Sequence, residues 1–541
     1  MVNSQRNSSP LVMIFLLFSI GVYGLSGGLT DQIASCLIVH NINNFTTFAD
    51  ALNNRSRAYY ELLNFSIQNL RLTQSMIPKP IAIILPESVK QLVHTVLCSR
   101  EGPWEIRVRS GGHTYEGTSF IAADGAPFVI IDMMNLNKVS VDLETKLAWV
   151  EGGATLGETY YAIAESSNSH GFTAGSCPTV GIGGHFGGGG FGLLSRKYGL
   201  AADHVVDALL IDANGRLLDR ETMGEDVFWA IRGGGGGVWG IVYAWKIRLL
   251  EVPKIVSGFI VSRPGTKRYI AKLVNKWQHV APYLADDFYL SCFVGADLPE
   301  SVTTGISATF RGFYLGPRSK AVSILKEVFP ELNIMEEDCT EMSWIESIVF
   351  FSGLSNSSSV SDLKNRYLKD KGYFKAKADY VGAPIPFRGI RVALDFLEKQ
   401  PKGNVILDPY GGIMQIISSE SIPFPHREGN LFGIQYLVSW QEEDDSKSPE
   451  YIDWVRALYS SMTVFVSSGP RAACSNYMDF DLGVIEVINS SVPVPPKDAD
   501  PVEIARRWGE KYFLKNYDRL VRAKQCLPKS TRHSSRQFQK E

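Results

Sequence analysis

The chain has 541 residues, of which 45% are hydrophobic and 20% charged, and its formal net charge is −2. The composition is typical of a soluble globular protein, and the length predicts two or three lobes. Basic residues gather only as a short scatter near the C-terminus, so nucleic-acid binding has no electrostatic support.

The N-terminus, residues 1–28, is predicted to be a signal peptide. A weakly basic start at Arg6 precedes an apolar run from Leu11 to Leu25, which small residues close. This run is too short for a comfortable membrane span, and no later segment has 18 consecutive apolar residues. We therefore expect entry into the secretory pathway and no stable membrane insertion.

The region after the signal peptide is predicted to be an α+β lobe. Residues from about 30 to 70 have a helical pattern that ends before Pro78. An amphipathic helix is predicted over 87–98, and short strands over 81–86, 104–110, 128–133, 146–153, 208–212 and 241–250. Strands that run into glycine turns indicate ligand-binding turns at the strand ends.

The pattern of predicted secondary structure changes after residue 252. Antiparallel strands are predicted over 257–263, 289–297 and 303–316, with helices over 320–329 and 449–462. Runs of strands beside helices indicate a second α+β lobe. One continuous helix is predicted over 503–524, after a proline-rich turn at 492–497.

Secretion implies an oxidising compartment for the seven cysteines. An odd number leaves at least one outside an intrachain disulfide. None lies in a CxxC pair or near paired histidines, so no metal site is expected. Acceptor sequences for N-glycosylation predict a glycoprotein; they lie at Asn44, Asn54, Asn64, Asn356 and Asn489.

Three glycine-rich segments carry the functional signal. In the first, residues 107–119, Gly111 and Gly112 allow a ligand to approach the backbone closely, with His113 directly beside it. A tight hairpin with an exposed histidine is the alternative. In the third, residues 231–242, five consecutive glycines are as compatible with a flexible loop as with a phosphate contact.

The second segment, residues 175–192, has nine glycines among eighteen residues. That is too many for a helix or a packed strand, and the spacing matches neither a P-loop nor a dinucleotide-binding turn. We expect a long loop around a large flat ligand, with an exposed, reactive Cys177 and with His185 pointing inward. A structural loop with a free or disulfide-bonded cysteine is the alternative.

Together the three segments resemble the berberine bridge enzyme-like family of plant FAD-linked oxidases. The resemblance continues in collinear order over about residues 30–525, through segments such as DPYGGIM, IPFPHREGNL and NYMDFDLG. It implies a two-lobed α+β FAD-linked oxidase fold. An FAD-binding domain over 30–252 would be completed by 474–541, and a substrate-binding domain over 253–473 would be an antiparallel sheet backed by helices.

The resemblance also implies FAD bound covalently through His113 and Cys177, which makes the flavin a stronger acceptor. It implies a Cys36–Cys98 disulfide. The remaining cofactor-binding residues implied by the family motifs are Arg109, Ser110, Gly111, Gly112, Ser119, Gly181, Ile182, Gly183, Gly184, His185, Phe191, Gly237, Val242 and Asn476.

The catalytic residues implied by the resemblance are Tyr477, Gln435 and Val180. A valine at position 180 goes with access of O₂ to the flavin, and hence with an oxidase that forms H₂O₂. Gly433 stands where several relatives have a glutamate base, so Tyr477 is the best candidate to accept or relay a substrate proton. Phe191 lacks the hydroxyl that many relatives have at this position.

The predicted reaction is hydride transfer from a small plant metabolite to the flavin, with O₂ as the second substrate. The missing glutamate favours a benzylisoquinoline or protoberberine-type alkaloid. An alcohol or carbohydrate oxidase, acting on a monolignol or oligosaccharide, is the alternative enzyme. An inactive secreted flavoprotein with a binding or defence role is the alternative of another class.

Three further polar residues are predicted to have structural rather than catalytic places. His426 is expected in a structural corner, and Glu420 and Asp408 at the surface or in turns. The final location is expected to be the apoplast, the vacuole or an ER-derived vesicle.

Overall fold

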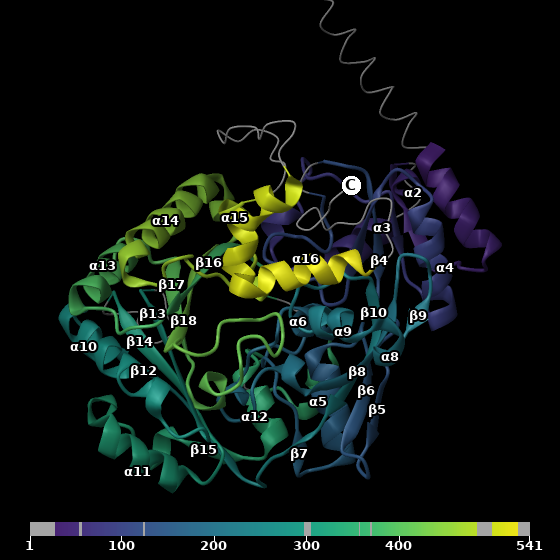
Figure 1. The fold of residues 1–541 in the computed structure, drawn as a ribbon. Helices are drawn as coiled ribbons and strands as arrows, with labels where there is room; N and C mark the ends of the chain where they lie inside the picture. Colours follow the sequence, from purple (N-terminus) through teal and green to yellow (C-terminus); the bar gives the residue numbers. More distant parts are fainter. Residues whose placement is uncertain are drawn as a thin grey trace, which may run out of the picture.

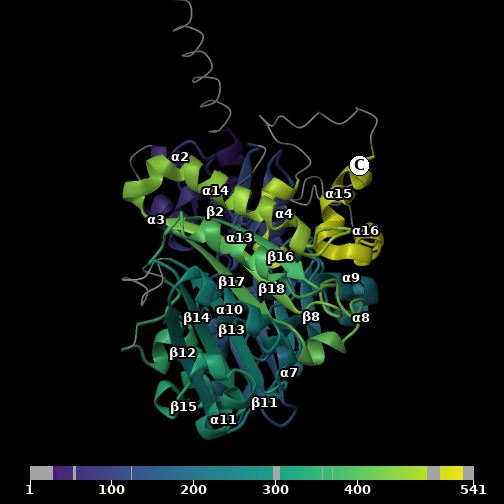
Figure 2. The same ribbon diagram turned by 90° about the vertical axis from the view of Figure 1, so that its left-hand side faces the viewer.

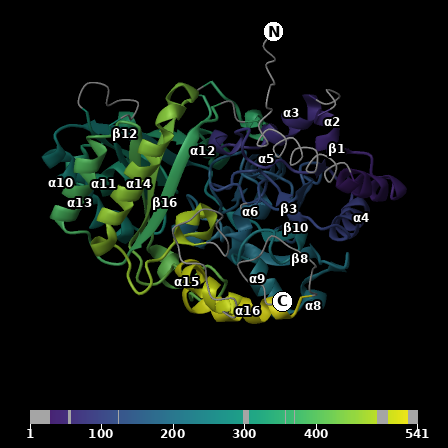
Figure 3. The same ribbon diagram turned by 90° about the horizontal axis from the view of Figure 1, so that it is seen from above.

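The computed structural model describes residues 28–52, 57–122, 125–296, 305–355, 357–367, 370–483 and 500–527. The predicted signal peptide, apart from its last residue, and the proline-rich turn at 492–497 lie outside these residues. Figures 1 and 3 show two lobes side by side, with the C-terminal helices crossing the first of them. We call the part built from residues 28–252 and 474–527 the first lobe, and residues 253–473 the second lobe.

The first sheet of the first lobe has the order β1 (Phe45–Thr47), β2 (Ala82–Ile84), β4 (Phe128–Asp132) and β3 (Glu105–Arg109). Strands β2, β4 and β3 are parallel. Apolar side chains alternate between two buried layers, because successive residues of a strand point to opposite faces. Ile84 packs toward α4 (Val89–Arg100), and Ile83 packs toward α3 (Arg57–Phe65).

The second sheet of this lobe is antiparallel, in the order β5 (Val139–Asp142), β6 (Leu147–Glu151), β10 (Ile241–Arg248), β8 (Val205–Ile211) and β9 (Leu217–Leu218). A short pair joins β7 (His170–Gly171) to β11 (Leu250–Glu251). The other α-helices of the lobe among the described residues are α2 (Phe48–Leu52), α5 (Leu156–Ser166), α6 (Ile182–Gly187), α7 (Ser195–Tyr198), α8 (Arg220–Met223), α9 (Glu225–Ile231), α15 (Pro501–Phe513) and α16 (Tyr517–Gln525), with a further helix over residues 28–39.

The second lobe is built on a seven-stranded antiparallel sheet. Its order is β15 (Thr340–Met342), β12 (Val256–Pro264), β14 (Ser307–Tyr314), β13 (Phe288–Gly295), β17 (Gly403–Pro409), β18 (Phe432–Trp440) and β16 (Tyr373–Val381). Figures 1 and 2 show one face covered by α10 (Lys267–Gln278), α11 (Arg318–Val328), α13 (Phe387–Leu397) and α14 (Ser448–Ser461). Helix α12 (Trp344–Phe351) packs into the core of the first lobe. The mixed α+β fold and its large antiparallel sheet confirm the predicted fold class.

The region 503–524, predicted as one helix, is two. Helix α15 ends at Phe513, and Leu514 has a positive φ of 45°, which breaks the helix. The side-chain amide of Asn516 then donates hydrogen bonds to backbone oxygens of the 419–423 segment, including Ser419 at 2.7 Å. Tertiary contacts therefore end the helix at a point where the apolar pattern of the sequence continues without a break. The helical pattern predicted for 30–70 is likewise interrupted, by β1.

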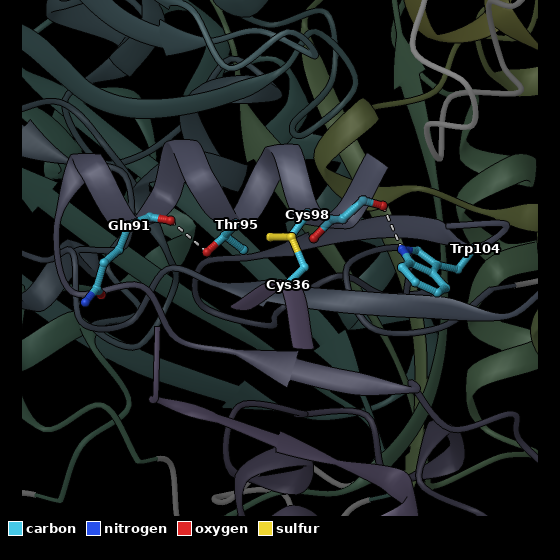
Figure 4. Close-up of a disulfide and its surroundings, with 6 residues drawn as sticks. Cys36, Gln91, Thr95, Cys98 and Trp104 are labelled. Carbon is cyan, nitrogen blue, oxygen red and sulfur yellow. Dashed lines mark hydrogen bonds between the residues drawn. A yellow bond between two sulfur atoms is a disulfide. The ribbon is translucent and has the colours of Figure 1, made fainter. Parts of the chain in front are cut away.

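The disulfide implied by the family resemblance is present. Cys36, in the helix over residues 28–39, is bonded to Cys98 near the end of α4 (Figure 4). Directly after Cys98, the Ser99 carbonyl accepts a hydrogen bond of 2.7 Å from the Trp104 indole. The disulfide therefore fixes the N-terminal helix onto a buried part of the first lobe. Within the part of the chain that the structure describes, no helix is both long and apolar enough to cross a bilayer.

A buried cluster of charges joins the two lobes. Lys375 and Lys377 project from β16 and are each only 3% exposed. Lys375 contacts Glu116 and lies 2.7 Å from Asp479, and Lys377 contacts Asp479 and lies 2.9 Å from Asp481. Both lysines belong to the second lobe, whereas all three carboxylates belong to the first. We call these five residues the interlobe charge cluster.

We expect Asp479→Asn to lower the free energy of unfolding by about 3–5 kcal/mol, because the two buried lysines lose their shared carboxylate. Denaturant unfolding followed by fluorescence measures this change. Asp453→Asn is the control, since Asp453 is 77% exposed and its pair with Arg456 contributes little. Equal stabilities of the two variants would contradict a stabilising role for the cluster.

Candidate active site

A cavity of about 710 Å³ lies between the lobes. On the first lobe its wall comes from the glycine-rich segments around residues 110–113, 175–192 and 235–242. On the second lobe its wall is the face of β13, β14, β17 and β18 that the helices leave uncovered. The volume is that of a site for a cofactor or a drug-sized ligand.

The turn at residues 110–113 is held against the second glycine segment. The Ser110 hydroxyl donates to the Gly152 carbonyl at 2.8 Å. A Cβ added at Gly111 would lie 2.2 Å from the backbone nitrogen of Gly181, so neither turn has room for a side chain at this contact. Gly112 has a φ of +69°, in the left-handed region that glycine adopts without strain. The two turns thereby form one continuous backbone surface.

The segment 175–192 contains a helix, contrary to the prediction of a loop. Helix α6 covers Ile182–Gly187, and Ile182 and Phe186 are fully buried in the core one turn apart. A Cβ at Gly187 would lie 2.7 Å from the Cα of Gly236. Burial of the two apolar side chains offsets the low helix propensity of glycine, while the glycines permit close contact with the third segment.

His113 and Cys177 lie on the same wall, joined through one hydroxyl. His113 Nε2 is 2.8 Å from Thr179 Oγ1, and Cys177 Sγ is 3.7 Å from that same oxygen. Burial lowers the pKa of His113 to about 4, so the ring is neutral at pH 7. Cys177 is only half-exposed, and burial raises the pKa of its thiol. The expectation of an exposed and reactive thiol is therefore wrong.

His185 is neutral and has a defined tautomer. Burial lowers the pKa of this histidine to about 4. Its Nε2 accepts a hydrogen bond of 3.1 Å from the backbone N–H of Gly175, so the ring proton is on Nδ1. His185 can therefore present an N–H donor but not a positive charge to a ligand.

Asp408 lies in the cavity wall, so its prediction as a surface or turn residue is wrong. The Tyr289 hydroxyl donates to its carboxylate at 2.5 Å, and burial raises the pKa of this carboxyl. Strand β17 alternates, with Val405 and Leu407 in the core under the helices. The alternation places Asp408 on the opposite face, toward the cavity. The position of Asp408 in the alternating segment NVILD, residues 404–408, was the signal in the sequence that could have placed it on this face.

Gln435 and Tyr477 come together through Tyr115. The Tyr115 hydroxyl donates to Gln435 Oε1 at 3.1 Å, and the rings of Tyr115 and Tyr477 are stacked with centroids 5.4 Å apart. Burial raises the pKa of both phenols. Both hydroxyls are therefore protonated at neutral pH, and neither is poised to act as a base. Tyr115 is a lining residue that the sequence argument passed over although it lies two positions after His113.

An aromatic group lies beside Gly433, which stands at the position of the missing glutamate. A Cβ at Gly433 would lie 3.6 Å from the Tyr410 ring. That ring stacks on Phe191, with centroids 5.0 Å apart and planes 7° apart. Phe191 is therefore held by an apolar ring contact. This contact does not need the hydroxyl that many relatives have at this position.

Most of the predicted site residues line the cavity, but two do not. Arg109 is fully buried, pairs with Asp132 at 2.7 Å and donates to the carbonyl oxygen of Leu63. Ile182 belongs to the core. The predicted residues that line the cavity are Ser110, Gly111, Gly112, His113, Ser119, Cys177, Val180, Gly181, Gly183, Gly184, His185, Phe191, Gly237, Val242, Gln435, Asn476 and Tyr477.

His426 and Glu420 are not lining residues. His426 is 1% exposed, its Nε2 lies 2.9 Å from the Tyr512 carbonyl oxygen, and its ring stacks on Tyr380. Glu420 is exposed. The structure therefore gives both residues the non-catalytic places predicted from the sequence.

The first-lobe wall fits an FAD molecule. The hydroxyl of Ser119 is buried in the lining without a hydrogen-bond partner, as expected where a polar ligand supplies the partner. A Cβ added at Gly184 would meet no atom within 4 Å, and Gly237 has a φ of +74°. Backbone N–H groups in such glycine turns can hold a pyrophosphate, with His185 and His113 beside the ring system.

Comparison with known proteins identifies this site. The family described as "FAD binding domain" matches residues 80–220, and that described as "Berberine and berberine like" matches residues 473–527. Berberine bridge enzyme-like D-2 of Nicotiana tabacum is 60% identical over 530 residues, which cover 96% of this chain and 93% of that protein. The chain belongs to the berberine bridge enzyme-like family. It is an FAD-linked oxidoreductase.

Further members of the family resemble the chain over nearly its whole length. Reticuline oxidase of Eschscholzia californica is 48% identical over 525 residues, covering 97% of this chain and 94% of that protein. A variant of berberine bridge enzyme solved in complex with (S)-reticuline superimposes with a TM-score of 0.86 at 47% identity, covering 94% of this chain and 98% of that one. The family predicted from the three glycine segments is thereby confirmed.

We expect His426→Gln to reduce the acid sensitivity of folding. Burial holds the pKa of His426 at about 3, whereas an unfolded chain takes up this proton at about pH 6.5. The neutral ring therefore stabilises the fold fully above pH 6.5, and this contribution is lost as the pH falls toward 3. Between pH 6.5 and 4 the loss amounts to about 3 kcal/mol.

Urea unfolding at several pH values tests this expectation. The free energy of unfolding of His426→Gln should fall less steeply below pH 6.5 than that of the unmodified protein. His279→Gln, at an exposed position, should follow the unmodified protein. Parallel pH profiles for all three proteins would contradict the assignment.

Proposed function

We propose that this protein is a secreted oxidase that carries FAD on covalent bonds to His113 and Cys177, and that it oxidises a small plant alkaloid of the benzylisoquinoline or protoberberine type. The observation that carries the proposal is the pairing of two walls. One wall presents His113 and Cys177 around a shared hydroxyl, and the opposite wall presents the Tyr289 phenol and the Asp408 carboxyl group, whose pKa values are both raised.

The geometry of Thr179 supports double attachment. When the Thr179 hydroxyl donates to Cys177 Sγ, it accepts from the N–H of His113 Nε2, and in that tautomer the free lone pair of the ring is on Nδ1. The low pKa of His113 keeps the ring neutral at pH 7, so one ring nitrogen always has a lone pair for a bond to the cofactor. The same hydroxyl lies near Cys177 Sγ and stabilises a thiolate there, against the effect of burial. One side chain therefore orients both attachment points.

The chemistry of the polar residues that line the cavity favours an amine over an alcohol. When bound, FAD takes up a hydride from the substrate and passes the electrons to O₂, which becomes H₂O₂. Oxidation of an alcohol also requires a base for the hydroxyl proton. An amine requires none, because its nitrogen lone pair forms the C=N bond of an iminium ion as the hydride leaves. Tyr477 and Tyr115 have raised pKa values, and Asp408 is engaged by Tyr289.

The surroundings of Val180 are compatible with the use of O₂. Val180 lines the cavity and packs against the core, and its N–H donates to the Cys177 carbonyl at 3.3 Å. It is therefore fixed beside one of the attachment points. A side chain longer by one methylene would enter a closely packed wall at the position where O₂ must approach.

Two features support passage through the secretory pathway. The glycosylation acceptors Asn44 and Asn64 are exposed, and the Cys36–Cys98 disulfide is of the kind that persists in oxidising compartments. With the predicted signal peptide, they favour the apoplast, the vacuole or an ER-derived vesicle as the final location.

We expect the purified protein to keep its yellow colour in the pellet after acid precipitation. His113→Ala and Cys177→Ala should each retain the colour through the remaining bond, and the double variant should release it. Absorption spectra of pellet and supernatant measure the distribution. Release of the flavin from the unmodified protein would rule out covalent attachment without affecting the family assignment.

A substrate screen that detects H₂O₂ tests the proposed reaction. We expect turnover of tetrahydroisoquinoline and protoberberine amines, and expect Tyr477→Phe to keep this turnover within about tenfold, since no base is needed. Turnover of alcohols or sugars instead, with a loss of about 10²–10⁴ in Tyr477→Phe, would support the alcohol or carbohydrate oxidase. A correctly folded flavoprotein without turnover on either class would support a binding role.

A further inference from the structure

The second-lobe wall of the cavity contains a positive charge without a counter-ion. Arg311 lies on β14, directly opposite Ser291 of β13, and both residues line the cavity. Its guanidinium group lies 4.1 Å from the centroid of the Phe293 ring. Its Nε is buried and has no hydrogen-bond partner. No carboxylate among the described residues forms an ion pair with it.

The deeply buried arginines of the chain differ from Arg311 in this respect. Arg109 pairs with Asp132, and Arg427 pairs with Asp203 at 2.6 Å. Arg196 donates to several backbone carbonyl oxygens, including that of Tyr410 at 3.0 Å. A buried cation is costly unless it is paired or fully hydrogen-bonded. Arg311 is half-buried and, among the described residues, its side chain has neither an ion pair nor a hydrogen-bond partner.

From these contacts we infer that Arg311 binds a carboxylate group of the substrate. The inference rests on the proposed function, because it treats the second-lobe wall as the substrate side of the cavity. The contact with the Phe293 ring positions the guanidinium, and none of its N–H groups donates a hydrogen bond to the described residues. That edge matches the two oxygens of a carboxylate. The substrate class is then an amine metabolite that also carries an acid group.

The charges around Arg311 favour a substrate group over an internal partner. Asp408 is close enough to affect the pKa of Arg311, but its carboxylate is engaged by the Tyr289 hydroxyl. Burial lowers the pKa of Arg311, and the nearby Asp408 and Tyr289 only partly oppose this effect. A carboxylate in the cavity would supply both the missing charge and the missing acceptors. The glycine turns on the opposite wall provide separately for the phosphates of FAD.

The binding of two matched probes to the FAD-loaded protein tests this inference. Benzoate and benzamide have nearly the same shape, but only benzoate is charged. Perturbation of the flavin absorption spectrum and calorimetry both measure their binding without any turnover. We expect benzoate to bind at least about tenfold more tightly than benzamide, as charge-assisted hydrogen bonds are about twice as strong as neutral ones.

Variants of Arg311 identify the group responsible. Arg311→Met should weaken benzoate binding by about 10- to 100-fold and leave benzamide binding within about twofold. Arg311→Lys should retain part of the preference, because it keeps the charge but loses the planar pair of donors. Arg391→Met is the control; it removes one exposed charge from α13, on the face of the sheet away from the cavity.

Equal binding of benzoate and benzamide to the unmodified protein would overturn the inference, and so would an equal effect of Arg311→Met on both probes. The comparison in the unmodified protein decides the question even if Arg311→Met does not fold. Because no turnover is measured, a failed amine screen would leave the preference for benzoate intact. Conversely, amine turnover without this preference would reject the role of Arg311 alone.

Discussion

The interlobe charge cluster is the interaction on which the active site depends. Its carboxylates are close in sequence to the aromatic residues of the cavity: Glu116 directly follows Tyr115, and Asp479 is two residues after Tyr477. Pairing them with the lysines of β16 joins the two lobes and also fixes the stacked tyrosines against β18. The strength of buried ion pairs depends on accurate geometry, so a shift of one lobe against the other would be costly.

The opposite wall depends on backbone contacts that only glycine allows. Gly111 meets Gly181, and Gly187 meets Gly236, at separations that exclude any Cβ. Three segments far apart in the sequence therefore form a single surface of backbone groups. Such a surface suits a large, flat and partly anionic ligand, because N–H groups and open space occur side by side. His113 and Cys177, the proposed attachment residues, lie on this surface, and Thr179 contacts both.

The two walls differ in chemical character. The glycine wall supplies neutral donors, including the N–H of His185, whereas the sheet wall supplies Asp408, Arg311 and the Tyr289 phenol in a largely buried setting. Burial favours the neutral form of each acid, so the wall is better suited to orient a substrate than to remove a proton from it. This property supports the proposed amine oxidation, in which Arg311 is the proposed group that selects among amines.

The sequence alone determined the family, the α+β class, the disulfide and most of the cavity lining. These follow from local signals: glycine clusters, hydrophobic periodicity and segments whose order matches a family. It did not reveal helix α6, because the glycines that disfavour a helix are required by contacts with distant backbone. It also missed the break at Leu514, where the positive φ is accompanied by contacts of Asn516 with the 419–423 segment.

Only the tertiary structure decided which polar residues face the cavity. Asp408 was expected at the surface, and Arg311 drew no attention, because a charged residue in a strand is most simply read as solvated. The pairing of β14, β13, β17 and β18 places Asp408 and Arg311 on the face of the sheet that lines the cavity. Arg109, which was expected in the site, instead pairs with Asp132 away from the cavity. The sequence specifies which residue types are present, whereas the face on which each one lies is set by strand pairing between segments distant along the chain.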